Sequence, residues 1–259
     1  MIGVFDSGSG GLSVLKEIVR LLPDEEYVYF ADNAFCPYGE KTAAEIQARA
    51  HVITDLLLAK GAQIIVVACN TATAADIADL RASYPDVPFI GMEPAVKPAA
   101  IGTRTGVIGV LATAGTLKGS KYLNTKGKYE DDVKIVEHVG QGFVELVEAG
   151  DLDSPKAEEI VRESVTPLLA ECADTIVLGC THYPFLAPVI RRIAGDDVTV
   201  IDPAPAVARQ TVNIMQQRGL LPYPLPEPTE SKEAPKVHLM ASGDTKMLKR
   251  LFSLAFGQS

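Results

Sequence analysis

Two short apolar segments that end in cysteine stand out in the pattern of hydrophobic and polar positions. Residues 64–68 form an uninterrupted apolar run before Cys69, and the apolar run at 175–179 precedes Cys180. Such runs are typical of strands buried on both faces of a parallel sheet. Ligands of open parallel sheets bind beyond the carboxyl ends of the strands. A single cysteine could equally be a core residue. Two cysteines in equivalent positions instead indicate a functional site at the carboxyl edge of each predicted sheet.

The surroundings of the two cysteines repeat. Each is followed by a helical stretch and then by a strand ending in an acidic residue, Pro and Ala, with Glu93 24 positions after Cys69 and Asp202 22 positions after Cys180. The first strand and glycine turn, at 3–10, also resemble the segment that begins at Gly106. We interpret the chain as two homologous α/β halves, each presenting one thiol to a shared cleft.

The rest of the chain is predicted to alternate between strands and helices in both halves. The periodicity and the capping signals predict further strands near 2–5, 26–31, 87–91, 105–111, 132–137, 198–202 and 236–241, and helices near 12–22, 42–61, 72–82, 141–150, from 154, 206–218 and 244–256. Hinge-like proline segments at Glu93-Pro94 and 203–205 bracket the second half, and residues 222–235 form a Pro- and Glu-rich surface loop.

The predicted fold class is α/β, with two similar three-layer domains whose mainly parallel sheets are related by pseudo-two-fold symmetry. The active site lies in the cleft between them. Residues 1–94 and 207–259 form the domain that carries Cys69, and residues 95–206 form the domain that carries Cys180. The C-terminal segment therefore returns to the first domain.

Composition and charge exclude several classes of partner and of binding site. The 259 residues are 47% hydrophobic and 22% charged, with a net charge of −9, which argues against nucleic acid or an anionic membrane as a partner. The chain has no transmembrane run and begins directly with a strand, so we expect a cytoplasmic protein with four reduced thiols. No Cys/His spacing resembles a zinc site, so we expect no metal. Cys36 is interpreted as incidental, and Cys172 as a core residue of a helix.

The glycine turn at 6–11 follows the first strand and opens a helix. It does not match a dinucleotide fingerprint, because Ser13 occupies the third glycine position, and the chain lacks the Gly-Lys-Ser/Thr of a P-loop. Asp6 would repel a phosphate, whereas the free N–H groups at the start of a helix suit a carboxylate. The turn could also be only a tight connection between strand and helix.

Two opposed thiols can invert a carbon centre. One thiolate removes a proton from one face of a carbon, and the other thiol delivers a proton to the opposite face, which requires one ionised and one neutral thiol. A free cysteine has a pKa of about 8.5, within reach of modest tuning by neighbours. Asp6 and His182 are the candidates to assist, one near each thiol, although His182 could be structural.

Short polar residues surround the two cysteines. Asn70, Thr71 and Thr181 follow them directly and can hold the amino and carboxylate groups of a substrate, with Ser7, Tyr38 and Gly39 supplying further contacts. Apart from Lys41 at the edge, these loops contain no Lys or Arg. Neutral donors bind an anion well when the site is dry and preorganised.

These motifs together resemble a known family. Asp6-Ser7-Gly8-x-Gly10-Gly11-Leu12, Asp32 with Pro37-Tyr38-Gly39, Cys69-Asn70-Thr71-Ala72 and Gly179-Cys180-Thr181-His182-Tyr183-Pro184 resemble the bacterial glutamate racemases of the aspartate/glutamate racemase superfamily. The resemblance covers essentially the whole chain. It implies interconversion of L- and D-glutamate without pyridoxal phosphate, metal or other cofactor, with D-glutamate then used in peptidoglycan synthesis.

The resemblance also implies residue roles. Cys69 would deprotonate D-glutamate and Cys180 L-glutamate, Asp6 and His182 would assist, and Glu148 would support them, with Glu145 as a nearby alternative. The implied substrate contacts are Ser7, Tyr38, Gly39, Asn70, Thr71 and Thr181, with Thr113 and Thr116 as weaker candidates. Family members are often dimers, so we expect a homodimer. Because the first strand begins at residue 2, we expect no activator-binding N-terminal extension.

Three alternatives remain. The chain could be a racemase for aspartate or another amino acid, since the sequence does not measure the depth of the pocket. It could bind an amino acid without turnover, although such a protein needs no paired thiols. It could be a dithiol redox protein, which requires the two sulfurs within bonding distance.

Overall fold

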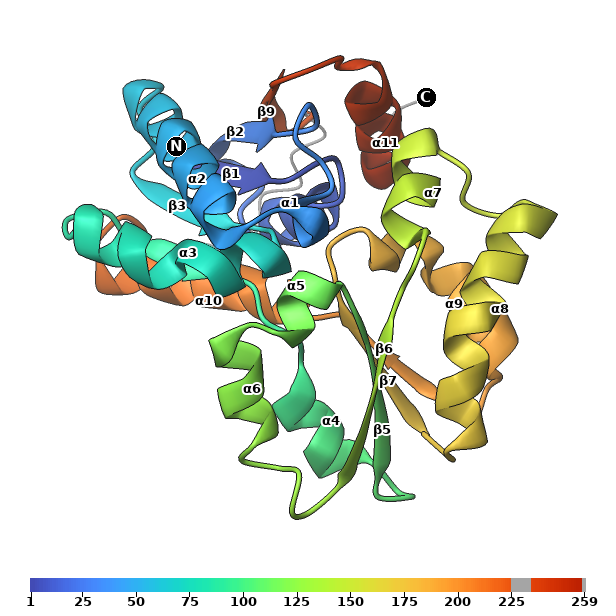
Figure 1. Ribbon diagram of the computed structural model, residues 1–259. Helices are drawn as coiled ribbons and strands as arrows, with labels where there is room; N and C mark the ends of the chain where they lie inside the picture. The colour runs from blue at the N-terminus through green and yellow to red at the C-terminus, as the bar shows by residue number, and fades with distance from the viewer. Residues whose placement is uncertain (225–233, 258–259) are drawn as a thin grey trace.

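The computed structural model describes residues 1–224 and 234–257, and its first sheet is built largely from the N-terminal part of the chain (Figure 1). Its strands occur in the order β4-β3-β1-β2-β9, and all neighbours are parallel. The bounds are Ile2–Asp6 (β1), Glu26–Ala31 (β2), Ile64–Val67 (β3), Phe89–Gly91 (β4) and Lys236–Ala241 (β9). β9 pairs with β2, so the chain returns to the first sheet as predicted.

The second sheet repeats the strand order of the first. Its order is β6-β5-β7-β8, again with parallel neighbours, and its bounds are Val107–Ala112 (β5), Lys134–Val139 (β6), Thr175–Gly179 (β7) and Thr199–Ile201 (β8). When β5 to β8 are matched to β1 to β4 in sequence, both sheets have the same connectivity. The predicted class of two parallel α/β sheets is therefore confirmed.

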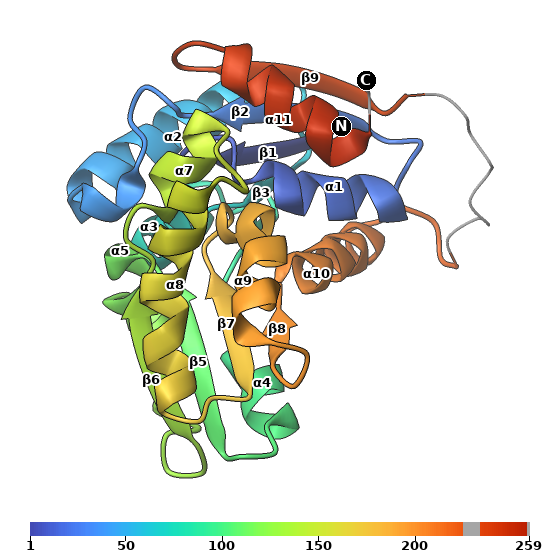
Figure 2. The ribbon, with the colours of Figure 1, turned by 90° about the vertical axis from the view of Figure 1, so that its right-hand side faces the viewer.

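Helices cover both sheets (Figures 1 and 2). In the first half α2 packs on α3, and α1 lies between α10 and α11, while in the second half α8 packs on α9. The bounds are Leu12–Leu21 (α1), Ala43–Ala59 (α2), Asn70–Ser83 (α3), Val96–Gly102 (α4), Ala114–Leu117 (α5), Ser120–Lys126 (α6), Phe143–Ala149 (α7), Pro155–Ala170 (α8), Ala187–Ala194 (α9), Ala204–Gln217 (α10) and Lys246–Phe256 (α11). Two 3₁₀ turns lie at Tyr38–Glu40 (η1) and Tyr183–Leu186 (η2).

Local signals explain where the helices begin and end. Thr42 and Glu45 form the predicted capping box of α2, and the Ser154 side chain caps α8. The helix predicted from 141 begins at Phe143, because Gly142 has a left-handed backbone with φ of +80°. The proline segment at 203–205, predicted as a hinge, is instead the start of α10.

The structure bears on three further predictions, which concern Cys172, the domain boundary and the loop at 222–235. Cys172, predicted to be core, is exposed and follows α8 with φ of +63°, so the correction is that α8 ends before it. The predicted domain boundary at 206/207 falls inside α10, and the division itself stays a prediction. The surface loop predicted for 222–235 lies largely outside the described residues.

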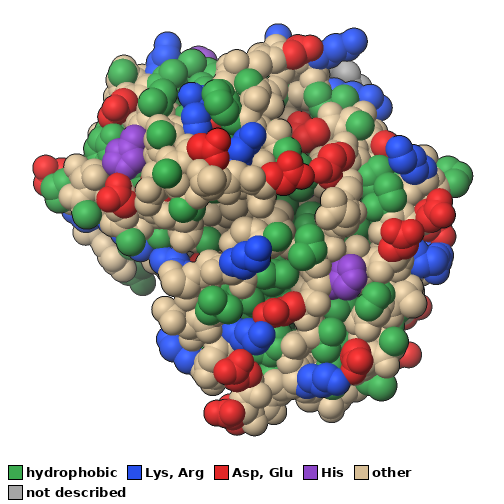
Figure 3. All heavy atoms as spheres, viewed as in Figure 1, with side chains coloured by type: hydrophobic (Ala, Val, Ile, Leu, Met, Phe, Trp, Pro, Cys, Tyr) green, Lys and Arg blue, Asp and Glu red, His purple; other side chains and the backbone are tan. Residues whose placement is uncertain are grey.

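One apolar core connects the two halves. It contains Ile2 and Val4 of β1 together with Ile176 and Leu178 of β7. The residues described by the structure include no helix with both the length and the apolar composition needed to cross a bilayer. On the face shown in Figure 3, basic and acidic side chains are interspersed, and the basic ones form no continuous stripe.

Candidate active site

The two cysteines lie just beyond the carboxyl ends of β3 and β7, which are equivalent strands of the two sheets. Cys69 is the N-cap of α3, and Cys180 directly follows Gly179. Both are buried, with 4% and 6% exposure, and both are free thiols. A negative charge on Cys180 would raise the pKa of Cys69, so the two sulfurs share one electrostatic environment. Each of the two sheets therefore has one buried thiol beyond the end of an equivalent strand.

The surroundings of Cys69 favour its neutral form. Burial raises the pKa of Cys69 well above its usual range, and the negative charge of Asp6 raises it further. The N–H of Ala72 donates to Sγ over 3.4 Å and opposes this shift only in part. The thiol itself lies 3.8 Å from the Ser7 hydroxyl oxygen, its hydrogen-bond acceptor. Cys69 is thus suited to donate a proton.

Cys180 has a different partner, the imidazole of His182. Nδ1 of His182 lies 3.7 Å from the sulfur of Cys180, and Nε2 lies 2.7 Å from Oε1 of Glu148. Burial alone would lower the pKa of His182, but its hydrogen bonds to the thiol and to Glu148 raise it well above the usual value. A thiolate at Cys180 would therefore face an imidazolium N–H.

Glu148 is held from the opposite half of the molecule. Its carboxylate accepts the Ser9 N–H at 2.6 Å and the Ser9 hydroxyl at 3.2 Å. Burial alone would raise the pKa of Glu148, but His182 and Ser9 lower it, so the group is a carboxylate. Glu145, the alternative considered from sequence, is exposed on the same helix. The structure thus places Glu148, and not Glu145, at the imidazole.

Asp6 ties the glycine turn to the second half. Its fully buried carboxylate accepts N–H groups from Gly8 at 3.3 Å and Gly11 at 2.9 Å, and the Thr181 hydroxyl at 3.3 Å. Burial raises the pKa of Asp6, although the charge of His182 and the N–H of Gly11 oppose it. Asp6 thus occupies the N–H groups that sequence analysis considered for a ligand.

The glycines of this turn permit close approach to the imidazole. A methyl group added to Gly10 would overlap the His182 ring, and one added to Gly8 would overlap Glu148. Only glycine allows the backbone to pack this closely. The turn is therefore neither a phosphate loop nor merely a tight connection.

The predicted substrate-binding residues fall into two groups around the thiols. Ser7, Asn70, Thr71, Thr116 and Thr181 are buried, and Thr71 links the halves, because its hydroxyl lies 2.9 Å from that of Thr113. The amide of Asn70 is 3% exposed, and neither its oxygen nor its nitrogen has a hydrogen-bond partner among residues 1–224 and 234–257. A buried amide normally has partners, so Asn70 is suited to bind a polar ligand.

Tyr38 and Gly39 occupy the loop opposite Thr113. The Tyr38 hydroxyl donates to Asp32 at 2.5 Å, and Arg49 holds the same carboxylate with two hydrogen bonds of 2.7 and 2.9 Å. The Tyr38 hydroxyl is therefore already hydrogen-bonded within the protein. Gly39 lies against Thr113, where an added methyl group would come within 3.2 Å of the threonine Cβ.

Sequence reasoning missed the position of Cys36. Its sulfur, a ring nitrogen of His182 and a carboxylate oxygen of Glu148 all lie within 4.8 Å of one another. Burial raises the pKa of Cys36, whereas His182 lowers it. The available signal was its place directly before Pro37-Tyr38-Gly39, in a loop already assigned to the site.

Two cavities lie beside the site residues. One of about 280 Å³ includes Cys36 and Glu148 in its lining, and a smaller one of about 80 Å³ is lined in part by Gly39, Thr113 and Tyr183. The two thiols themselves are buried.

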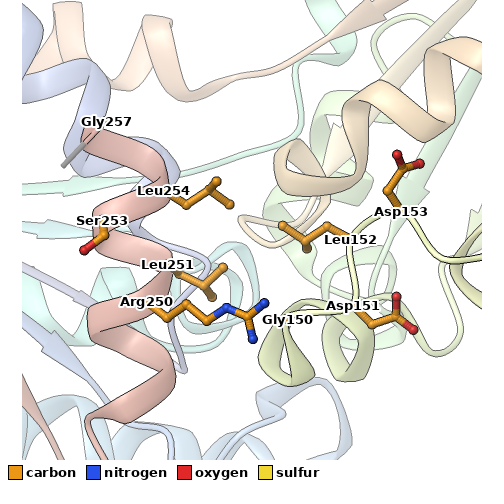
Figure 4. Close-up of a pocket in the computed structure, with 9 residues that line it drawn as sticks. All are labelled: Gly150, Asp151, Leu152, Asp153, Arg250, Leu251, Ser253, Leu254 and Gly257. Atoms are coloured by element: carbon orange, nitrogen blue, oxygen red, sulfur yellow. The ribbon is translucent and has the colours of Figure 1, made fainter. Parts of the chain in front are cut away.

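A groove of about 720 Å³ lies beyond them, between α11 and the turn after α7. In Figure 4, Leu152 points across it toward Leu251 and Leu254, and Arg250 lies at Gly150, the C-cap of α7. A guanidinium at the carboxyl end of a helix is favourable. This groove is lined by none of the predicted site residues, and Arg250 and Met247 of α11 lie close to Gly150, at the end of the helix that carries Glu148.

Comparisons with known proteins agree with this geometry. The family model described as Asp/Glu/Hydantoin racemase matches residues 2–211. The chain is 48% identical over 257 residues to a glutamate racemase of Ectopseudomonas mendocina, covering 99% of this chain and 95% of that one. It is 52% identical over 220 residues to a glutamate racemase of Roseiflexus, covering 85% and 81%.

Solved structures of the same kind superpose on it. The glutamate racemase RacE1 of Bacillus anthracis has a TM-score of 0.86 and 33% identity, covering 100% of this chain and 94% of that one. The Escherichia coli glutamate racemase in complex with L-glutamate has a TM-score of 0.83 and 33% identity, covering 98% and 94%. Since the match extends over nearly the whole chain, the protein belongs to the Asp/Glu/Hydantoin racemase family and, within it, to the glutamate racemases.

Proposed function

We propose that this protein interconverts L- and D-glutamate by proton transfer between Cys69 and Cys180, without a cofactor or metal. The observation that carries the proposal is the placement of two buried thiols at equivalent strand ends of two similar sheets, with unlike acid–base partners. A neutral thiol and a thiolate beside an imidazolium are the acid and the base that inversion requires.

With L-glutamate the proposed sequence begins at Cys180. Its thiolate removes the α-proton, the α-carbon becomes planar, and the Cys69 thiol delivers its own proton to the opposite face. Cys180 ends as a thiol and Cys69 as a thiolate, so the number of protons is conserved. D-glutamate would follow the same path backwards, with Cys69 as the base.

Neutral donors support binding of the substrate. Asn70 offers an unpartnered amide, and the Ser7, Thr71 and Thr181 hydroxyls lie in the same buried region. Such groups hold an anion without neutralising the thiolate, as preorganised dipoles in a dry site can. Thr113, Thr116, Tyr38 and Gly39 are the remaining proposed contacts.

Hydrogen exchange in heavy water tests the proposal. Reduced protein treated with EDTA and given no cofactor is incubated with L-glutamate, and proton NMR and polarimetry follow the α-proton signal and the optical rotation. Loss of both signals is expected. Retention of both, in folded protein, contradicts the proposal and favours an amino-acid-binding protein. L-aspartate in a parallel sample decides between glutamate and the main alternative substrate, because faster loss with aspartate contradicts glutamate specificity.

Three further parts of the proposal concern the cellular setting. D-glutamate from this reaction would supply peptidoglycan synthesis, which is tested by rescue of a bacterium that requires D-glutamate. The free thiols support a reducing compartment, the cytoplasm. A homodimer stays a prediction, to be checked by sedimentation.

A further inference from the structure

A second cluster of ligand-type side chains lies away from the thiols, between α2 and α3. It consists of His51 on α2 and of Asp76 and Asp79 on α3, whose ligand atoms all lie within 4.8 Å of one another. His51 Nε2 is 2.7 Å from Oδ2 of Asp79. The sequence gives no sign of the cluster, because the histidine comes from a different helix from the two aspartates.

Asp76 is the unusual member. Its side chain is 2% exposed, and neither carboxylate oxygen has a hydrogen-bond partner in the part of the chain that the structure describes. A buried charge without a partner is costly. Asp79 adds a second negative charge nearby, and His51 is already bonded to Asp79. The cluster therefore contains more negative charge than its protein partners compensate.

We propose that His51, Asp76 and Asp79 bind one divalent first-row transition ion, with Zn²⁺ as the representative. One imidazole nitrogen and two carboxylates are a ligand set that such ions accept, at about 2.0–2.2 Å from zinc. Ca²⁺ fits less well, because it prefers six to eight oxygen ligands. The exposed side chain of Asp79, at 56%, has room to adjust around the ion.

The proposed ion would connect two helices that lead into the site. α2 follows the Tyr38-Gly39 loop, and α3 begins at Cys69 and Asn70. The ion would fix α3 against α2 without contacting the thiols, so its role would be to stabilise structure and not to take part in proton transfer.

The test must separate this cluster from the thiol-containing one at Cys36, Glu148 and His182. Co²⁺ is a suitable probe, because coordination by thiolate gives intense sulfur-to-cobalt charge-transfer absorption, whereas nitrogen and oxygen ligands give only weak d–d bands. The full chain, reduced and stripped with EDTA, is titrated with Co²⁺ while absorption and thermal unfolding are followed. Zn²⁺ is then added to displace the cobalt.

The variants are Asp76→Asn and His51→Gln, with Asp86→Asn, an exposed aspartate in the loop after α3, as the matched control. We expect one Co²⁺ without charge-transfer bands, a raised Tm, and binding at least about tenfold weaker in both cluster variants but unchanged in the control. Equal binding in the cluster variants and the control, binding with thiolate bands alone, or no binding at millimolar Co²⁺ would each overturn the proposal.

Discussion

Glu148 and His182, 34 positions apart in the chain, share a hydrogen bond of 2.7 Å between Oε1 and Nε2. Because Ser9 of the first half holds the same carboxylate, the orientation of the imidazole beside Cys180 depends on both halves being in contact. The acid–base group of the second thiol thus includes a carboxylate that residues of both halves hold.

Replacement of Glu148 by Gln tests this dependence. Without the carboxylate the pKa of His182 falls toward its ordinary value, so the imidazolium is lost at a lower pH. We expect kcat to fall about ten- to a hundredfold, and the alkaline decline of the pH–rate profile to move to lower pH. Glu145→Gln, which changes an exposed glutamate on the same helix, is the control; an equal effect there contradicts the assignment.

Single replacement of either thiol tests the two-base mechanism. Cys69→Ala and Cys180→Ala should each reduce racemisation in both directions by about a hundredfold or more, because each direction uses both thiols. Circular dichroism with each enantiomer as substrate measures the loss. Cys172→Ala changes an exposed thiol and should leave the rate unchanged. Full activity in either of the first two variants rules out the mechanism.

The unpartnered amide of Asn70 predicts a binding effect without a folding cost. Asn70→Ala removes hydrogen bonds to a charged substrate, and we expect KM to rise roughly tenfold to a hundredfold. Tm should change little, since the amide has no partner among the described residues. Thr54→Val removes a buried hydroxyl that also lacks a partner among the described residues, and it is expected to leave KM unaltered. A large loss of Tm in Asn70→Ala would indicate a structural role instead.

The glycine turn predicts a steric effect on catalysis. In Gly10→Ala the added methyl group displaces the His182 ring, and misplacement of a catalytic group by about 1 Å can reduce the rate about a hundredfold. Gly102→Ala is the comparison, because nothing lies within 4 Å of the methyl group it adds. Steady-state kinetics of both variants measure the loss of rate. Normal activity of Gly10→Ala contradicts the close packing of Gly10 against the His182 ring.

Asp76 predicts a pH-dependent stability in metal-free protein. Burial raises its pKa from 3.8 to about 6, with Asp79 adding to the shift and His51 opposing it. Between these values the unfolded chain has lost the proton and the native chain keeps it, so stability falls as pH rises from about 4 to 6. Asp76→Asn should stabilise the protein at pH 7, by less than the roughly 3 kcal/mol that the full shift corresponds to because solvent screens part of the charge, and by little below pH 4. Denaturant unfolding in EDTA measures this, and equal stability at pH 7 contradicts it.

The strands were predictable because buried parallel strands have short apolar sequences. The positions of the two thiols were predictable because each cysteine directly follows such a run. The repeat was visible for the same reason, and the matching strand orders confirm it. Contacts between distant segments were not predictable from the pattern: the approach of Cys36 to His182 was missed, and Glu148 was named only through the family resemblance, because its contact with His182 depends on how α7 lies against the glycine turn. The short helices α4 to α6 were missed because they are too brief to show a clear period.

The unlike surroundings of the two thiols are subject to a thermodynamic limit. L- and D-glutamate are mirror images, so in an achiral solvent their free energies are equal, and the equilibrium between them favours neither. In the proposed reaction each thiol would deprotonate one of the two enantiomers, and Cys69 and Cys180 have different neighbours. For the proposed reaction those differences are constrained: they can change kcat and KM for each direction, but kcat/KM must stay equal in both.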